Sequence, residues 1–233
     1  MNIKQVYKYF SDLVFPNRCP CCKKCIKWNE LICENCLKEF PVITVKPCDK
    51  CGKTNCICER ELSYDYCICP TYYEGIIKAG ILNLKLNNGL NFAEYFADKI
   101  CIKLNELKLA EKIDIVTAVP MSKGKYIERG YNQAYELAKI ISVKIKKPLG
   151  KNIIKKKDSK LIQHELTYEE RIQSVKGAFI FKNGEYNIKG KNILICDDVI
   201  TSSSTLNECA KLLKSQGASN VFCVCLATTR LNH

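Results

Sequence analysis

The feature that most constrains this chain is the distribution of its cysteines. Of 17 cysteines in 233 residues, twelve lie between Cys19 and Cys69. Such a density would indicate a disulfide framework in a short secreted chain, but the N-terminus lacks the apolar stretch and cleavage site of a signal peptide. No apolar run approaches the ~18 residues of a membrane-spanning helix. We therefore expect a cytoplasmic protein, without a membrane span, whose thiols bind metal.

The spacing of the first cysteines indicates a zinc ribbon. Two C-x2-C pairs, Cys19/Cys22 and Cys33/Cys36, are separated by ten residues. Each pair can direct two thiolates at one ion, and two pairs complete a tetrahedral, structural zinc site. Cys25 leaves a second register open, because Cys22 and Cys25 have the same spacing. The matching separation within the two pairs favours the first register.

A second and less regular set of thiols follows. Cys48 and Cys51 form another C-x2-C pair, and Cys56 and Cys58 form a C-x-C pair. Gly52 follows the second thiolate, where a zinc knuckle often needs a left-handed residue. The sequence therefore predicts one structural Zn2+ and allows a second. Metal binding would supply folding energy that a segment with few large apolar residues cannot obtain from a core.

Beyond the cysteines, apolar strands alternate with amphipathic helices. We expect helices at 74–90, 91–108, 132–145 and 205–215, and strands at 113–119, 178–181, 192–196 and 221–227. Cys67 and Cys69 alternate with aromatic residues and are expected to be half-buried in a further strand. The pattern predicts an α/β fold with a mainly parallel, doubly wound sheet over residues 71–233, preceded by a zinc-ribbon module over residues 1–70. Such sheets bind ligands at the carboxyl ends of their strands.

The most informative segment lies at one such carboxyl end. An apolar run leads into Asp197 and Asp198, and a series of hydroxyl residues then enters a helix: Thr201, Ser202, Ser203, Ser204 and Thr205. Backbone N–H groups at a helix N-terminus, with hydroxyls beside them, bind phosphate. Carboxylates accept hydrogen bonds from sugar hydroxyls or hold a hydrated Mg2+. A phosphorylated sugar fits both, although each residue alone could be a turn former or a helix cap.

This segment resembles the phosphoribosyl pyrophosphate (PRPP) loop of type I phosphoribosyltransferases. The resemblance implies that Asp197 and Asp198 contact the ribose hydroxyls and act in catalysis if the chain turns over. It also implies that Thr201 to Thr205 surround the 5′-phosphate. Ser203 stands where those enzymes usually have glycine, and it would weaken binding if the position needs a positive φ.

Other segments are similar to the ComF family of competence-associated proteins. They are Ala118-Val119-Pro120, Arg129-Gly130-Tyr131-Asn132-Gln133, and Gln163, Leu166 and Arg171 followed by Lys176-Gly177-Ala178-Phe179. The resemblance implies a phosphoribosyltransferase-like fold with an N-terminal zinc ribbon, PRPP with Mg2+ as ligand, and a role in DNA uptake on incoming single strands, with other uptake proteins as possible partners. Whether the chain only binds PRPP or transfers ribose 5-phosphate to a base or amine stays open.

Basic residues near the expected site can meet an anionic ligand. Lys123, Lys125 and Arg129 lie in an expected loop after the first strand of the larger domain, from which they could reach the pyrophosphate. The alternative is an ordinary solvated loop. Arg171 could bind a phosphate or pair with a neighbouring glutamate.

The net charge of +13 is a weaker signal, because lysines outnumber arginines 32 to 5, as an AT-rich genome would give without any functional reason. It does favour attraction to polyanions. Between residues 144 and 160, eight lysines accompany a single acid in an expected surface loop or edge. They could follow the backbone of single-stranded DNA or form a solvated face: Lys144, Lys146, Lys147, Lys151, Lys155, Lys156, Lys157 and Lys160.

Overall fold

The computed structural model describes residues 15–41, 43, 47–48, 50–53, 56, 62–86, 89–157, 175–182 and 186–230. Their helices and strands follow in the order α2 (Glu34–Lys38), β1 (Tyr66–Ile68), β2 (Thr71–Tyr72), α3 (Gly75–Lys85), α4 (Leu90–Glu106), α5 (Leu109–Lys112), β3 (Ile115–Ala118), α6 (Lys123–Arg129), α7 (Gln133–Lys144), β4 (Ile154–Lys156), β5 (Phe179–Phe181), β6 (Asn192–Ile200), α9 (Ser204–Ser215) and β7 (Asn220–Thr228).

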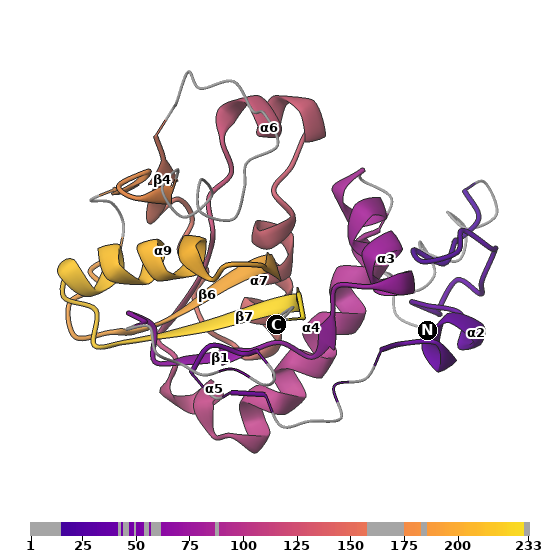
Figure 1. The fold of residues 1–233 in the computed structure, drawn as a ribbon, viewed down its shortest axis with the longest axis horizontal. Coiled ribbons are helices and arrows are strands. Elements are labelled where there is room, and N and C mark those ends of the chain that lie inside the picture. The colour runs from indigo at the N-terminus through magenta and orange to yellow at the C-terminus, as the bar shows by residue number, and fades with distance from the viewer. Residues whose placement is uncertain are drawn as a thin grey trace.

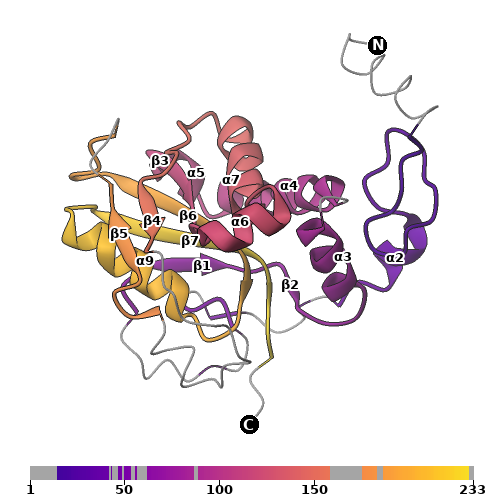
Figure 2. The same cartoon turned by 90° about the horizontal axis from the view of Figure 1, so that it is seen from above.

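The main sheet is parallel throughout its described strands. Its order is β1-β7-β6-β3, and β2 pairs with β7 beyond the end of β1 (Figures 1 and 2). Pro70 lies between β1 and β2 and cannot donate to a ladder, so the edge strand is interrupted there. The prediction of a mainly parallel α/β sheet is confirmed.

Side chains of the two central strands alternate between two apolar cores. Ile193 and Ile195 of β6 face the core that contains α9, whereas Leu194 and Cys196 face the core that contains α4 and α7. Figures 1 and 2 show α9 on one side of the sheet and these other helices on the opposite side. Both faces of the central strands are therefore buried, as expected for a doubly wound parallel sheet.

Two predicted features of the larger domain differ from the structure. The strand at 178–181 forms as β5, but it pairs antiparallel with β4 and stays outside the main sheet. Each of these two strands buries only one of its three residues, so neither has the double burial of a central parallel strand. Cys67 and Cys69 are buried rather than half-buried, because β1 lies directly beside β7.

The first cysteine-rich segment packs on α3 and α4. The side-chain amide of Asn83 donates to the carbonyl of Pro20 (2.6 Å), and that of Asn91 donates to the side-chain oxygen of Asn17 (2.7 Å). Phe40 stacks on Phe96. Figure 2 shows this segment, with α2, at one end of the molecule beyond α3. None of the helices that the structure describes is long and apolar enough to cross a membrane.

Candidate functional site at the carboxyl end of β6

Asp197 and Asp198 lie inside β6 near its carboxyl end. The strand was expected to end at Cys196, but it continues through both acids to Ile200, since β6 remains paired with β7 as far as that residue. Successive side chains of a strand point to opposite faces. This alternation is broken across the two acids, since Val199 packs against the core of α4 and α7 and Ile200 belongs to the core of α9. Both acids line one cavity at the end of the strand.

Asp198 is held by a lysine that the sequence analysis missed. The ammonium of Lys85, at the end of α3, lies 3.2 Å from a carboxylate oxygen of Asp198, and both side chains are about three-quarters buried. Lys85 lies 113 residues before Asp198 in the chain, and only the packing of α3 against the sheet brings them together. The pair offers a ligand one cation and one acceptor at the same place.

Asp197 lies in an environment that disfavours its charge. Desolvation by burial, followed by the nearby carboxylate of Asp198, raises the pKa of Asp197 well above its usual range. One of its oxygens accepts a hydrogen bond from the backbone N–H of Asp198 (2.8 Å). A carboxyl group in this state gains from any ligand that donates hydrogen bonds to it.

The hydroxyl residues after β6 form a tight turn into α9. They surround a small cavity of about 20 Å³ together with Asp197, and the contributing hydroxyl residues are Thr201, Ser202, Ser203 and Thr205. Ser204 begins α9. Ser203 has φ +63°, a left-handed conformation that glycine adopts without strain and serine does not. The condition under which serine would be unfavourable here, a positive φ, is therefore met.

A larger cavity of about 200 Å³ adjoins the turn and shares Asp197 with it. Four basic side chains line it besides the two acids: Lys85, Lys125, Arg129 and Lys156. Burial, then the proximity of Arg129, Lys156 and Lys85, lowers the pKa of Lys125. Cations crowded in this way are suited to a multiply charged anion.

The basic segment after β3 is a helix, α6, and not the expected loop. Ser122 precedes it and Gly130, at φ +76°, ends it in the left-handed conformation that closes many helices. Lys125 and Arg129 are four residues apart and so share one side of the helix, which explains why both line the cavity. Lys123, at the start of α6, is exposed and is not among the described residues that line the cavity.

Gln133 adds a polar group that the sequence analysis had not assigned to the site. Its side chain is buried and lines the same cavity, and its oxygen accepts a hydrogen bond from Arg129 (3.4 Å). Its buried Nε2 has no hydrogen-bond partner within the described part of the chain. A buried donor in this state is costly, so the cavity fits a ligand that carries an acceptor oxygen.

Four cysteine sulfur atoms come together in the first cysteine-rich segment. They lie within 4.8 Å of one another: Cys19, Cys22, Cys33 and Cys36. Cys25 is exposed and outside this group. Burial opposes ionisation of Cys19, but hydrogen bonds from the backbone of Cys33, Cys22 and Cys21 outweigh it and lower its pKa to about 7. A thiolate stabilised in this way is a suitable zinc ligand.

Three of the four thiols predicted for a second metal also gather. The sulfur atoms of Cys48, Cys51 and Cys56 lie within 4.8 Å of one another. Gly52 has φ +73°, as predicted for the turn after the second thiolate. Cys58 lies outside the described residues, as do Arg171 and Lys160. The three gathered thiols fit a thiolate metal site that lacks one described ligand.

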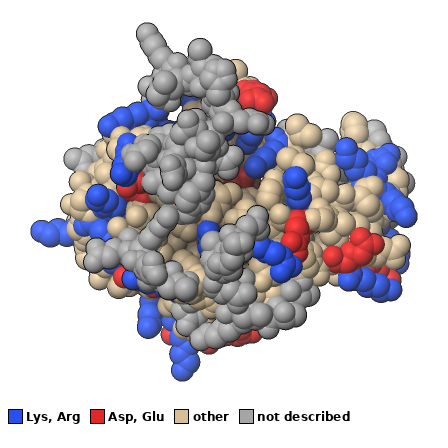
Figure 3. Space-filling view, viewed as in Figure 1, with Lys and Arg blue, Asp and Glu red and all other residues tan. Residues whose placement is uncertain are grey.

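The lysines predicted for DNA do not act alike. Lys144 pairs with Asp98 (2.6 Å), and Lys147 donates to the carbonyl of Glu111 (3.1 Å). Lys156 lines the cation-rich cavity instead of an outer face. The other lysines of the tract that the structure describes are exposed: Lys146, Lys151, Lys155 and Lys157. On the face shown in Figure 3, basic side chains are scattered and not gathered into one stripe.

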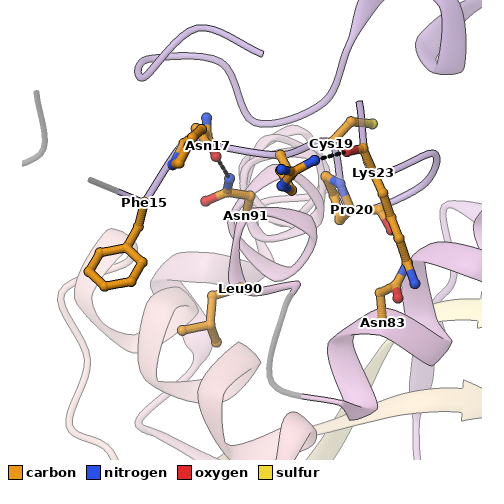
Figure 4. Close-up of a pocket in the computed structure, with 10 residues that line it drawn as sticks. Phe15, Asn17, Cys19, Pro20, Lys23, Asn83, Leu90 and Asn91 are labelled. Atoms are coloured by element: carbon orange, nitrogen blue, oxygen red, sulfur yellow. Dashed lines mark hydrogen bonds between the residues drawn. The ribbon is translucent and has the colours of Figure 1, made fainter. Parts of the chain in front are cut away.

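A different cavity, of about 530 Å³, lies where the first cysteine-rich segment meets α3 and α4 (Figure 4). Its side-chain amides already have partners: Asn17 donates to the carbonyls of Lys27 and Glu30 within the segment and accepts from Asn91 of α4. The cavity contains no carboxylate among its described lining residues. The chemistry therefore concentrates at the smaller cavities beside β6.

Comparisons with known proteins agree with this arrangement. A family model of the phosphoribosyl transferase domain matches residues 98–231, and a model of the double zinc ribbon domain matches residues 10–71. The chain is similar to competence protein F of Haemophilus influenzae, with 29% identity over 204 residues that cover 81% of this chain and 85% of that protein.

Two further relatives carry related names. Competence protein ComFC of Bacillus subtilis is 24% identical over 205 residues, which cover 82% of this chain and 81% of that protein. The DNA utilization protein YhgH of Escherichia coli O157:H7 is 31% identical over 116 residues, which cover half of each chain.

Replacing Ser203 with glycine should stabilise the fold. A left-handed serine costs about 1–2 kcal/mol, which glycine would relieve. The extra freedom of glycine in the unfolded chain offsets part of this gain in stability. We expect Ser203→Gly to raise the free energy of unfolding by about 0.5–1 kcal/mol in urea denaturation. Ser204→Gly, placed in the first turn of α9, is the matched control and should lower it. Equal losses in both variants would contradict the assignment of strain to Ser203.

Asp197→Asn should make the fold more stable at neutral pH. The pKa of Asp197 is higher in the folded state than in the unfolded state. As the pH rises through the folded-state pKa, wild type therefore loses stability relative to the variant, whose asparagine does not titrate. The variant should therefore melt at a higher temperature than wild type at pH 7, and the difference should vanish near pH 4. Asp98→Asn, which breaks an exposed ion pair, should show no such gain. A gain of equal size at both pH values would refute the electrostatic cause.

Proposed function

The chain belongs to the phosphoribosyl transferase domain family and is a homologue of competence protein F, and we propose that it binds PRPP at the carboxyl end of β6. The observation that carries the proposal is the junction at Asp197, where the hydroxyl turn of 201–205 meets the cation-lined cavity. PRPP has a phosphate at one end, a diphosphate at the other and a sugar with two hydroxyls between them. The order of chemical groups along the site matches this order.

Each part of the ligand has partners of suitable chemistry. The turn formed by Thr201 to Thr205 and the start of α9 would bind the 5′-phosphate. Asp197 and Asp198 would accept hydrogen bonds from the ribose hydroxyls. The basic side chains of the larger cavity and the Nε2 group of Gln133 would bind the pyrophosphate, and Arg171 is proposed as a further phosphate contact.

Mg2+ is proposed as the companion of the pyrophosphate. When bound, it would neutralise charge on the diphosphate oxygens and so make pyrophosphate a better leaving group. The carboxylate oxygens of Asp197 and Asp198 could accept hydrogen bonds from the water molecules that hydrate the ion. If the chain turns over, the bond from C1 of the ribose to pyrophosphate breaks and a bond to a base or amine nitrogen forms. The carboxylates would stabilise the positive charge that develops on the sugar.

We also propose structural zinc in the cysteine-rich module. Cys19, Cys22, Cys33 and Cys36 would hold one ion, and Cys48, Cys51, Cys56 and Cys58 a second. We place the boundary of the module near residue 70, with β1 as the strand by which it joins the sheet of the larger domain, residues 71–233. A module of this kind can contact nucleic acid or another protein of the uptake machinery.

Single-stranded DNA in the cytoplasm is the proposed macromolecular partner. The relatives named for competence and DNA utilization support this, together with the net charge of +13. Lysines that are free of the ligand cavity and exposed would make the phosphate contacts: Lys146, Lys151, Lys155 and Lys157. Lys144 and Lys147 would have to leave their intramolecular contacts, and Lys156 would serve PRPP.

Calorimetric titration of PRPP with Mg2+ tests the ligand site. We expect wild type to bind with micromolar affinity and Asp197→Asn/Asp198→Asn to bind at least about 100-fold more weakly, because hydrogen bonds to charged groups contribute about 1.5–3 kcal/mol each. Asp98→Asn makes the same chemical change outside the site and should bind as wild type does. No heat and no thermal shift with wild type would refute the proposal. Pyrophosphate release in a screen of bases and amines would identify a transferase.

The salt dependence of oligothymidylate binding tests the DNA proposal. Neutralising three phosphate contacts should reduce the slope of log affinity against log salt by about 2, since each contact to a single strand contributes about 0.7. We expect this in Lys151→Gln/Lys155→Gln/Lys157→Gln, measured by fluorescence anisotropy. The control, Lys103→Gln/Lys108→Gln/Lys112→Gln, removes the same charge around α4 and α5. Equal slopes in the two triple variants would exclude the lysine tract as the DNA contact.

A further inference from the structure

The two cysteine-rich segments contain the same backbone knuckle. In the first, the N–H of Cys19 donates to the carbonyl of Lys24 and the N–H of Lys23 donates back to Cys19, both at 2.8 Å. In the second, Cys48 and Lys53 form the first of these bonds, and Gly52 donates to Cys48, again at 2.8 Å. Lys24 and Lys53 therefore occupy equivalent positions, two residues after the second cysteine of each pair.

The two lysines have opposite surroundings. Lys24 is exposed, as a lysine on a surface turn normally is. Lys53 retains only 6% of its accessible surface, and its ammonium donates a hydrogen bond to the backbone carbonyl of Thr201. A buried ammonium is costly unless it is hydrogen-bonded, so this contact is a fixed part of the fold. It joins the second knuckle to the first residue of the hydroxyl turn.

The second knuckle fits closely against the sheet beside that turn. A Cβ on Gly52 would lie 3.1 Å from the sulfur of Cys67 in β1, which is tighter than ordinary contact, and its positive φ also favours glycine. On the other side, Thr229 donates to the carbonyl of Ile200 (3.0 Å), which fixes the end of β6. The hydroxyl turn is thus held at its start by Thr229, the residue after β7, and by Lys53.

We propose that Lys53 is a positioning residue for the hydroxyl turn and that the second knuckle, folded around its metal, sets the affinity of this turn for the 5′-phosphate. This proposal rests on the proposed binding of PRPP. The backbone of Lys53 is fixed by its bond to Cys48, and the thiolates of the knuckle can hold their positions only when an ion neutralises and links them. Without the ion, Lys53 loses its anchor and the turn loses one of its two attachments. Zinc at this cluster then acts on the ligand site through one side chain.

The ligand test uses fragments of PRPP on the zinc-loaded full chain. Ribose 5-phosphate requires the hydroxyl turn, whereas pyrophosphate alone would bind to the cations of the larger cavity. We expect Lys53→Met to weaken ribose 5-phosphate and PRPP about tenfold, the order expected for losing one hydrogen bond to a charged group, and to leave pyrophosphate binding unchanged. Lys24→Met should match wild type for all three ligands, and Lys53→Arg should recover part of the loss. Equal weakening of all three ligands in Lys53→Met would indicate general damage and overturn the proposal.

A second measurement does not depend on PRPP. Hydrogen exchange followed by mass spectrometry should show faster exchange over 201–205 in Lys53→Met than in Lys24→Met, with the zinc content of both variants equal to that of wild type. If Lys53→Met does not fold, Lys53→Gln replaces it as the milder neutral variant. Unchanged exchange in the turn would overturn the positioning role, even if wild type fails to bind PRPP and the proposed function fails with it.

The metal dependence is tested by removing one ligand of the second cluster. Cys56→Ser leaves Lys53 in place but weakens the hold on the ion, and it should reproduce both the loss of ribose 5-phosphate affinity and the faster exchange at 201–205. Added Zn2+ should restore part of each. If Cys56→Ser loses metal by elemental analysis and still binds ribose 5-phosphate as wild type does, the control of the turn by metal is wrong.

Discussion

The parallel pairing of β6 with β7 is the constraint on which the rest of this structure depends. It runs from Asn192 to Ile200, so the ladder continues past both acids and ends only where the hydroxyl turn begins. Helices cover both faces of the strand, and its two acids line one cavity at its carboxyl end. The proposed ligand site therefore combines residues from both sides of the sheet: the turn into α9 on one side, and Lys85 of α3 and Gln133 of α7 on the other.

Electrostatics at that strand end favour a ligand over an empty site. Asp197 is desolvated beside another carboxylate, while Lys125 is crowded by three cations a short distance away. The protein alone does not fully stabilise the charge of either group. An anion that carries hydroxyl groups would do both, because its charge would pair with Lys125 and its hydroxyls would donate to Asp197. Such an arrangement lowers stability in exchange for affinity, which is a common property of binding sites. Ser203, in a left-handed conformation, adds strain at the same place.

The sequence predicted those parts that depend on local pattern. The apolar period identified the central strands and the helices α3, α4, α7 and α9, and the C-x2-C spacing identified the thiols of the first cluster. Residues brought to the site by long-range packing carried no such signal. Lys85 ends an amphipathic helix like any surface lysine, and Gln133 differs from a solvated glutamine only because α7 packs against the sheet. Lys156 was grouped with its neighbours in a charged run, but successive residues of β4 face opposite ways, so Lys156 lines the cavity while Lys155 is exposed.

Composition alone suggests that the cysteine-rich part is independent of the larger domain, but the fold shows this for only one of its two knuckles. A cluster of thiols with little apolar surface predicts a separate module stabilised by metal, and the first knuckle, docked on α3 and α4 through asparagine amides, agrees with that view. The second knuckle does not agree with it, since Gly52 packs against β1 and the buried ammonium of Lys53 binds the first residue of the hydroxyl turn. The second knuckle is thus attached, through the Lys53 ammonium and the Thr201 carbonyl, to the turn of the proposed ligand site. Two knuckles with the same backbone hydrogen bonds therefore differ in their contacts because of what lies beside them, and one lysine side chain in each shows the difference.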